Sequence, residues 1–229
     1  MLISHRHKFI TVDIPKTGTR TLREILSILG VVDFHGYPET GIDGQIFTHH
    51  NKAKDSKIHF QKLYNGLTSW SDYKKFSIIR NPWKRYLSYY TYRRENAIAY
   101  RDTPIEDKKL WPIRRINQGR GCLDWLSSVS SDFEGLYETI QMMDSQDSFI
   151  YDESGELLID YIANTETINE DIQRFLNSIG IEYKGGLVHA NKSTYYKSYL
   201  EYYNQEIIDL VTEKESKIID LMNLEIPKK

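Results

Sequence analysis

The stretch FITVDIPKTGTRTLREIL, residues 9–26, links an apolar segment to an amphipathic segment through a loop of lysine, glycine and threonine. The segment before the loop is short, rich in β-branched residues and ended by Pro15, so we predict a buried strand over 8–15. A strand, a tight loop and a helix make half of a βαβ unit, which predicts an α/β fold. The apolar residues after the loop recur at the spacing of one helix face, with a glycine suited to the helix end: Leu22, Ile25, Leu26, Leu29 and Gly30.

A second stretch, KKFSIIRNPWKRYLSYYTYRR (74–94), repeats the order of strand, loop and helix. Its FSII segment reads as a short buried strand with Arg80 at the C-terminal end. Asn81 and Pro82 are residue types that commonly begin a helix. We expect the inward face of this helix to consist of Trp83, Tyr86, Leu87 and Tyr90.

The rest of the chain extends the same pattern. No repeat, low-complexity stretch or linker divides it, so we expect a single domain over 1–229. Strands that alternate with helices predict a mainly parallel central sheet flanked by helices, with ligands at the C-terminal ends of the strands. The further elements predicted are helices over 51–64, 168–180 and 204–222, a strand over 156–164 and a mostly helical region over 96–145.

The composition excludes several classes of protein. Hydrophobic residues make up 40% of the 229 and charged residues 27%, as in an ordinary soluble domain. The net charge of −2 argues against a protein that coats nucleic acid or a membrane surface. Cys122 is the only cysteine, which excludes an internal disulfide and a CxxC metal site. Without an apolar run long enough to span a bilayer, we expect a cytoplasmic protein.

The loop PKTGTRT (15–21) has the chemistry of an anion site. Backbone N–H groups point outward at the start of a helix, where the helix dipole favours negative charge. A lysine adds a mobile positive charge, a glycine lets a ligand approach the backbone, and threonine hydroxyls add donors. The alternative is a capped helix start with a surface lysine. The residues expected to bind the anion are Lys16, Thr17, Gly18, Thr19, Arg20 and Thr21.

The two stretches together resemble the sulfotransferases that use 3′-phosphoadenosine 5′-phosphosulfate (PAPS), most closely the carbohydrate-type branch that includes heparan and chondroitin sulfotransferases. IPKTGTRTL is similar to the 5′-phosphosulfate loop of that family, and IIRNPWKRYLSYY to its 3′-phosphate motif. Residues 145–172 and 189–203 also resemble this branch. The likeness implies a P-loop-like sulfotransferase fold and, since this chain shows no membrane anchor, a bacterial or viral member.

The resemblance implies roles for individual residues. Arg80 and Ser88, eight positions later, would hold the 3′-phosphate of the nucleotide. Lys16 would neutralise the 5′-phosphate oxygen as the sulfuryl group leaves, which is stabilisation where charge develops. Lys192 and Ser193 would close over the nucleotide phosphates. PAPS is then the co-substrate, 3′-phosphoadenosine 5′-phosphate (PAP) the product, and no metal is needed.

The acceptor implied by the branch is a glycan or a small hydroxylated molecule, whose hydroxyl needs a general base. The resemblance implies His50 as the base, because the related branch commonly has a histidine with an alanine three residues later, here Ala53, and a histidine also titrates in the useful range. His49 and Glu39 are the alternatives. Aromatic and arginine residues of the 111–125 segment either line the acceptor site or belong to the core and surface.

Two other functions stay open on the residues alone. A P-loop kinase is disfavoured because the chain has no G-x4-G-K-S/T motif and no evident strand-end aspartate for Mg²⁺. A catalytically silent module that binds a nucleotide or a glycan is disfavoured by the presence of both Lys16 and a candidate base.

Overall fold

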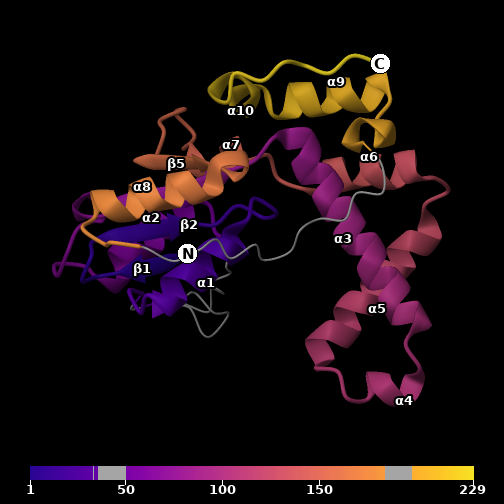
Figure 1. Ribbon diagram of the computed structural model, residues 1–229, viewed down its shortest axis with the longest axis horizontal. Coiled ribbons are helices and arrows are strands. Elements are labelled where there is room, and N and C mark those ends of the chain that lie inside the picture. Colours follow the sequence, from indigo (N-terminus) through magenta and orange to yellow (C-terminus); the bar gives the residue numbers. More distant parts are fainter. Residues whose placement is uncertain (33, 36–49, 184–197) are drawn as a thin grey trace. The chain divides into compact units, whose positions relative to one another are not determined.

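The computed structural model describes residues 1–32, 34–35, 50–183 and 198–229 of the chain (Figure 1). The chain divides into two compact units. Unit 1 consists of Met1–Asn81 and Ser145–Lys192, and unit 2 consists of Pro82–Asp144 and Ser193–Lys229. The prediction of a single domain over 1–229 stays a prediction.

Unit 1 is built on a sheet whose described strands follow the order β3-β1-β2-β4-β5. Strands β2, β4 and β5 run parallel, whereas β1 pairs antiparallel with both β2 and β3. The α/β class is therefore confirmed, but the sheet is mixed. The strands are β1 (Leu2–Ser4), β2 (Phe9–Val12), β3 (Phe34–His35), β4 (Lys74–Ile79) and β5 (Tyr161–Asn164).

The antiparallel strand β1 explains why the sheet differs from the prediction. It has three residues, too few for a recognisable alternation. A short turn reverses the chain after Ser4, with Lys8 at a φ of 51°, and sets Ser4 opposite Phe9. A hairpin of this size leaves no clear signal in the sequence.

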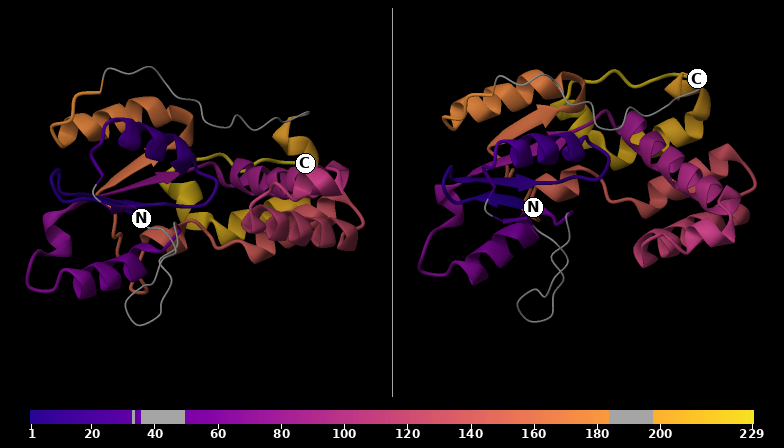
Figure 2. Two further views of the ribbon diagram at one scale, coloured as in Figure 1. Left: turned by 90° about the horizontal axis from the view of Figure 1, so that it is seen from below. Right: turned by 60° about the horizontal axis from the view of Figure 1, so that its bottom comes forward.

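Helices cover both faces of the sheet (Figure 2). On one face, α1 (Thr19–Ile28) and α8 (Ile168–Ser178) pack against a cluster that includes Phe9. On the other face, α2 (Ala53–Leu63) packs against a cluster that includes Ile10. Neighbouring residues of a strand point to opposite faces of the sheet, so β2 contributes side chains to both clusters. Burial of these apolar side chains supplies the main stabilisation of unit 1.

Unit 2 is helical. The predicted inward face of its long helix is confirmed, because Trp83, Tyr86, Leu87 and Tyr90 are all buried in one apolar cluster. Its elements are α3 (Pro82–Asp102), α4 (Ile105–Lys108), α5 (Ile113–Ser128), α6 (Asp132–Met142), η4 (Tyr199–Tyr202), α9 (Gln205–Lys214) and α10 (Ser216–Leu221).

The prediction of one continuous helix over 204–222 is wrong. The helix breaks at Glu215 into α9 and α10. Glu215 is buried, and its carboxylate accepts hydrogen bonds from Nη1 of Arg85 at 2.9 Å and from the hydroxyl of Tyr86 at 2.8 Å. A buried carboxylate needs such partners, and the break places it where it meets them.

The other predicted elements are confirmed with shifted ends. The third strand covers only Tyr161–Asn164, because Leu157 and Leu158 pair with residues 150–151 instead of the sheet. Three further described elements of unit 1 are short: η2 (Trp70–Asp72), α7 (Asp147–Ile150) and η3 (Thr165–Thr167). In the part of the chain that the structure describes, no helix is long and apolar enough to cross a membrane.

Candidate active site

The loop between β2 and α1 has an unusual backbone. Lys16 has a φ of 69° and Gly18 a φ of 87°, both in the left-handed region. Such a conformation is strained for a lysine and is concentrated at functional sites. The hydroxyl of Thr17 is buried and donates to the carbonyl of Ile14 at 2.9 Å. Thr17 therefore stabilises the turn from inside.

The first turn of α1 suits an anion. The helix begins at Thr19, its N-cap residue Gly18 offers no side chain, and no acidic residue stands in this turn. The N–H of Thr21 donates to the carbonyl of Gly18 at 3.0 Å, so the preceding N–H groups of the turn are the ones to meet a ligand. A Cβ on Gly18 would lie 2.9 Å from Cδ1 of Ile168, so the backbone passes close to α8. The loop therefore offers backbone N–H donors, without an opposing acidic side chain, to an anionic group.

Hydrogen bonds join the C-terminal ends of the three parallel strands. The hydroxyl of Thr165, which follows β5, lies 3.0 Å from the carbonyl oxygen of Thr17 and 2.9 Å from that of Ile79. Nη1 of Arg80, which follows β4, donates to the carbonyl of Lys16 at 3.0 Å. Arg80 thus contacts the loop directly.

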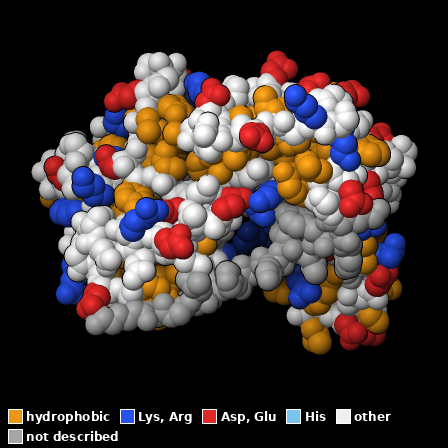
Figure 3. All heavy atoms as spheres, turned by 45° about the horizontal axis from the view of Figure 1, so that its top comes forward, with side chains coloured by type: hydrophobic (Ala, Val, Ile, Leu, Met, Phe, Trp, Pro, Cys, Tyr) orange, Lys and Arg blue, Asp and Glu red, His pale blue; other side chains and the backbone are white. Residues whose placement is uncertain are grey.

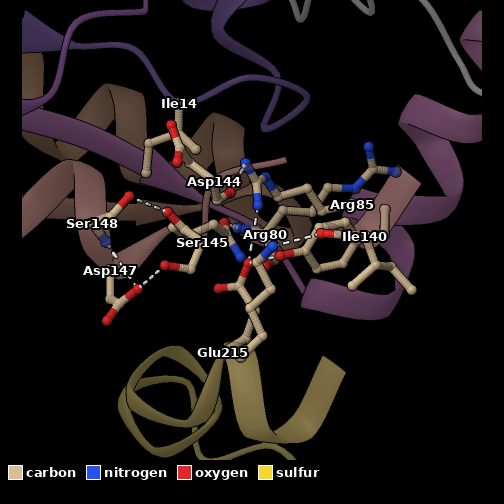
Figure 4. Close-up of polar contacts among 12 residues, drawn as sticks. Ile14, Arg80, Arg85, Ile140, Asp144, Ser145, Asp147, Ser148 and Glu215 are labelled. Atoms are coloured by element: carbon tan, nitrogen blue, oxygen red, sulfur yellow. Dashed lines mark hydrogen bonds and ion pairs between the residues drawn. The ribbon is translucent and has the colours of Figure 1, made fainter. Parts of the chain in front are cut away.

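Gln146 fixes the backbone of Arg80 from both sides. Its Oε1 accepts from the N–H of Arg80, and its Nε2 donates to the carbonyl of the same residue, each at 2.9 Å. The side chain of Gln146 is fully buried. Next to it, Asp147 accepts hydrogen bonds from the hydroxyl of Ser145 and from the N–H of Ser148 (Figure 4).

The sequence motifs assign no role to Gln146 or Thr165. Both lie within residues 145–172, a stretch that already resembled the carbohydrate-type branch. Thr165 directly follows β5, just as the loop follows β2 and Arg80 follows β4. Its place at the C-terminal end of a parallel strand is the sequence signal that identifies it.

His50 is bound to the same segment as the loop. Its Nδ1 lies 3.0 Å from the carbonyl oxygen of Asp13. A carbonyl only accepts hydrogen bonds, so Nδ1 carries the proton and Nε2 of the neutral ring holds the basic lone pair. Surrounding protein atoms desolvate the imidazolium and lower the pKa of His50 below its ordinary value, and the bond to Asp13 offsets only part of that effect. The lowered pKa favours the neutral ring of His50 around neutral pH.

The side chain of Asp13 is buried and forms an ion pair with Arg23 through Oδ2. Its other oxygen, Oδ1, has no hydrogen-bond partner among the described residues. The ion pair links the end of β2 to α1. It thereby holds the carbonyl that orients His50.

The remaining predicted site residues divide into three groups. Arg20 is exposed, and its Nε donates to Glu24 one turn along α1 at 3.2 Å. Ser88 is buried on α3 and belongs to unit 2. The others lie outside the described residues: Glu39, His49, Lys192 and Ser193.

Among the described residues, no three histidine, cysteine, aspartate or glutamate side chains are grouped so as to hold a metal ion.

The chain was compared with known proteins by family and by structure. No curated protein and no solved structure matches the chain. A family model described as the sulfotransferase family matches residues 1–223, which include the loop, Arg80 and His50. The chain belongs to the sulfotransferase family.

Proposed function

We propose that this protein transfers the sulfuryl group of PAPS to a hydroxyl of a glycan or of another small hydroxylated acceptor, with PAP as the second product. Membership of the sulfotransferase family supports sulfuryl transfer. The donor and the acceptor class are inferred from the motifs and from the chemistry of the loop.

One observation supports the proposal most strongly. The candidate base is hydrogen-bonded to the segment that carries the candidate leaving-group cation, since His50 is bound to the carbonyl of Asp13, three residues before Lys16. Sulfuryl transfer needs a base at the attacking oxygen and a positive charge at the leaving oxygen. A segment that orients the base and carries the cation supplies part of the preorganisation that transfer reactions require.

The chemical step assigns one task to each residue. Nε2 of His50 takes the proton of the acceptor hydroxyl as the oxygen attacks sulfur in line. The bond between sulfur and the bridging oxygen breaks, and that oxygen becomes part of the 5′-phosphate of the product. Lys16 neutralises the negative charge that grows there. A sulfate ester leaves with the acceptor, and the imidazolium returns its proton to water.

The residues assigned to the nucleotide follow from the loop and the motifs. The first turn of α1 and the hydroxyls of Thr19 and Thr21 are assigned to the 5′-phosphosulfate, and the side chain of Arg80 to the 3′-phosphate. Ser88 joins Arg80 in this assignment on the strength of the sequence motif. Arg20 is expected to contribute less to phosphate binding, because its exposed guanidinium already pairs with Glu24.

The experiment that tests the proposal is transfer of isotopically labelled sulfate from PAPS to a panel of glycans, glycolipids and small alcohols, read by mass spectrometry. We expect a labelled product with at least one hydroxylated acceptor, in the presence of EDTA, and about 10²- to 10³-fold slower formation of that product with the Lys16→Ala variant. Phosphate transfer from ATP that requires Mg²⁺ would identify a kinase instead. Tight binding of PAP with no turnover on any acceptor would identify a silent binding module.

A further inference from the structure

The connection between α3 and α5 exposes large aliphatic side chains. Ile105 is 73% exposed, Leu110 is 85% exposed and Ile113 is 76% exposed. All three belong to the short segment 104–115, which includes α4 and lies at the end of the pair formed by α3 and α5 (Figure 1). Three aliphatic side chains this exposed within nine residues of the chain make the segment a candidate interaction surface.

The same segment is rich in positive charge. Four basic residues stand against two acidic residues, and Nζ of Lys109 pairs with Glu106 at 2.7 Å. The guanidinium of Arg115 lies 3.8 Å from the ring centre of Trp111, which keeps the indole beside a cation. Hydrophobic spheres lie next to basic and acidic ones at the lower right of the face drawn in Figure 3. The basic residues are Lys108, Lys109, Arg114 and Arg115.

We propose that the segment 104–115, here called the α4 tip, docks on an anionic lipid membrane. The aliphatic side chains enter the headgroup region, the indole of Trp111 lies at the interface, and the cations contact anionic headgroups. A polyanionic glycan would meet the cations but would leave Leu110 and Ile113 exposed to water. An anionic membrane would contact both the aliphatic side chains and the cations of the tip.

The near-neutral charge of the whole chain does not oppose this docking. Attraction to a charged membrane falls off within a Debye length, so the cations nearest the surface decide its strength. The expectation that the protein does not coat membranes rested on net charge alone. The α4 tip is a local exception to it.

Vesicle co-sedimentation tests the proposal with the whole chain. We expect wild-type protein to partition to vesicles of phosphatidylcholine and phosphatidylserine, but not to vesicles of phosphatidylcholine alone. Partition should fall as salt is raised. Equal partition to both vesicle types, or none to either, would overturn the proposal.

Two variants separate the apolar part of the tip from the charged part. Leu110→Ser with Ile113→Ser should lower the partition coefficient about tenfold, and Arg114→Gln with Arg115→Gln should lower it by roughly thirtyfold. Leu67→Ser is the matched control, because Leu67 is 82% exposed but lies in unit 1, and it should leave partition unchanged. Circular dichroism melting checks that each variant is folded.

Other partners give different results. If the serine double variant keeps its partition while the glutamine double variant loses it, and if heparin competes equally with both, the tip binds a polyanion and the membrane proposal is wrong. If wild-type protein forms a dimer in sedimentation that the serine variant abolishes, the tip contacts a second copy. That outcome also overturns the proposal.

Discussion

Nδ1 of His50 is bound to the carbonyl oxygen of Asp13 at 3.0 Å, and this contact orients Nε2 of the ring as the basic atom. The contact joins two residues that lie 37 positions apart in the chain. The basic atom of the candidate base is therefore fixed by the segment that leads from β2 into the anion loop.

His50→Ala should lower the rate of sulfate transfer by about 10²- to 10⁴-fold, the usual contribution of a general base. The affinity for PAP should stay nearly unchanged, because the base contacts the acceptor. Turnover and calorimetry measure the two effects. His49→Ala and Glu39→Ala serve as the comparison and should retain most activity. Wild-type activity in His50→Ala, with loss of activity in either of the others, would move the assignment to that residue.

The pH profile of transfer should reflect the lowered pKa of His50. Desolvation disfavours the imidazolium, so the neutral base persists to lower pH than for an ordinary histidine. The rate should therefore be flat around neutral pH and fall only as pH drops below about 6.5, the ordinary value. The acid limb should be missing in His50→Ala. A limb that persists unchanged in the variant would assign the titration to another group.

Lys16→Ala should lower turnover by about 10²- to 10³-fold, as expected when a group that stabilises developing charge is removed. The affinity for PAP should change much less, since the charge on the bridging oxygen grows during transfer. Steady-state kinetics and calorimetry separate the two quantities. Lys74→Ala, at the opposite end of β4 from Arg80, is the control for removal of a lysine and should behave as wild type. A raised Michaelis constant with normal turnover would make Lys16 a simple binding residue.

Arg80→Ala tests the assignment to the 3′-phosphate. The variant should lose about 2–4 kcal/mol of affinity for PAP, the cost of removing a charged hydrogen-bond pair. Arg80 also donates to the carbonyl of Lys16, so its loss disturbs the loop for any nucleotide. Comparison of PAP with 5′-AMP separates the two effects, because 5′-AMP lacks the 3′-phosphate. An equal loss for both nucleotides would show that Arg80 acts only through the loop.

Gly18→Ala should destabilise the fold through two separate effects. A left-handed φ costs about 1–2 kcal/mol for alanine, and the new Cβ would also press on Ile168 at 2.9 Å. Gly155→Ala isolates the first effect, since Gly155 has a φ of 86° and no atom within 4 Å of the position that a methyl group would take. Urea unfolding should show a larger loss at Gly18. Equal losses of unfolding free energy at the two glycines would mean that Ile168 moves away from the new methyl group at no cost in stability.

Much of the fold follows from sequence because its signals are local. The loop lies between a β-branched run and an amphipathic helix, and Pro82 begins α3 as its residue type predicts. The hairpin of β1 was missed because three residues carry no period. The break at Glu215 was missed because it depends on Arg85, which lies far away in the chain.

The site shows the same division. Lys16, Arg80 and His50 were found from motifs, and the structure adds the contacts that join Arg80 to Lys16 and His50 to Asp13. Gln146 and Thr165 act through backbone atoms of other residues. A bond to a backbone carbonyl or N–H leaves no complementary residue type to recognise, so spacing alone does not reveal it.

The hydroxyl of Thr165 also constrains the order of events during synthesis of the chain. Strand β5 and Thr165 leave the ribosome only after the whole of Pro82–Asp144, which belongs to unit 2. Pairing of β4 with β5 closes a long loop, and such distant contacts form slowly. Until then the nascent segment after β2 lacks the bond that Thr165 makes to Thr17. Nascent chains stalled before residue 165 should therefore hold this loop less well ordered than chains released beyond it.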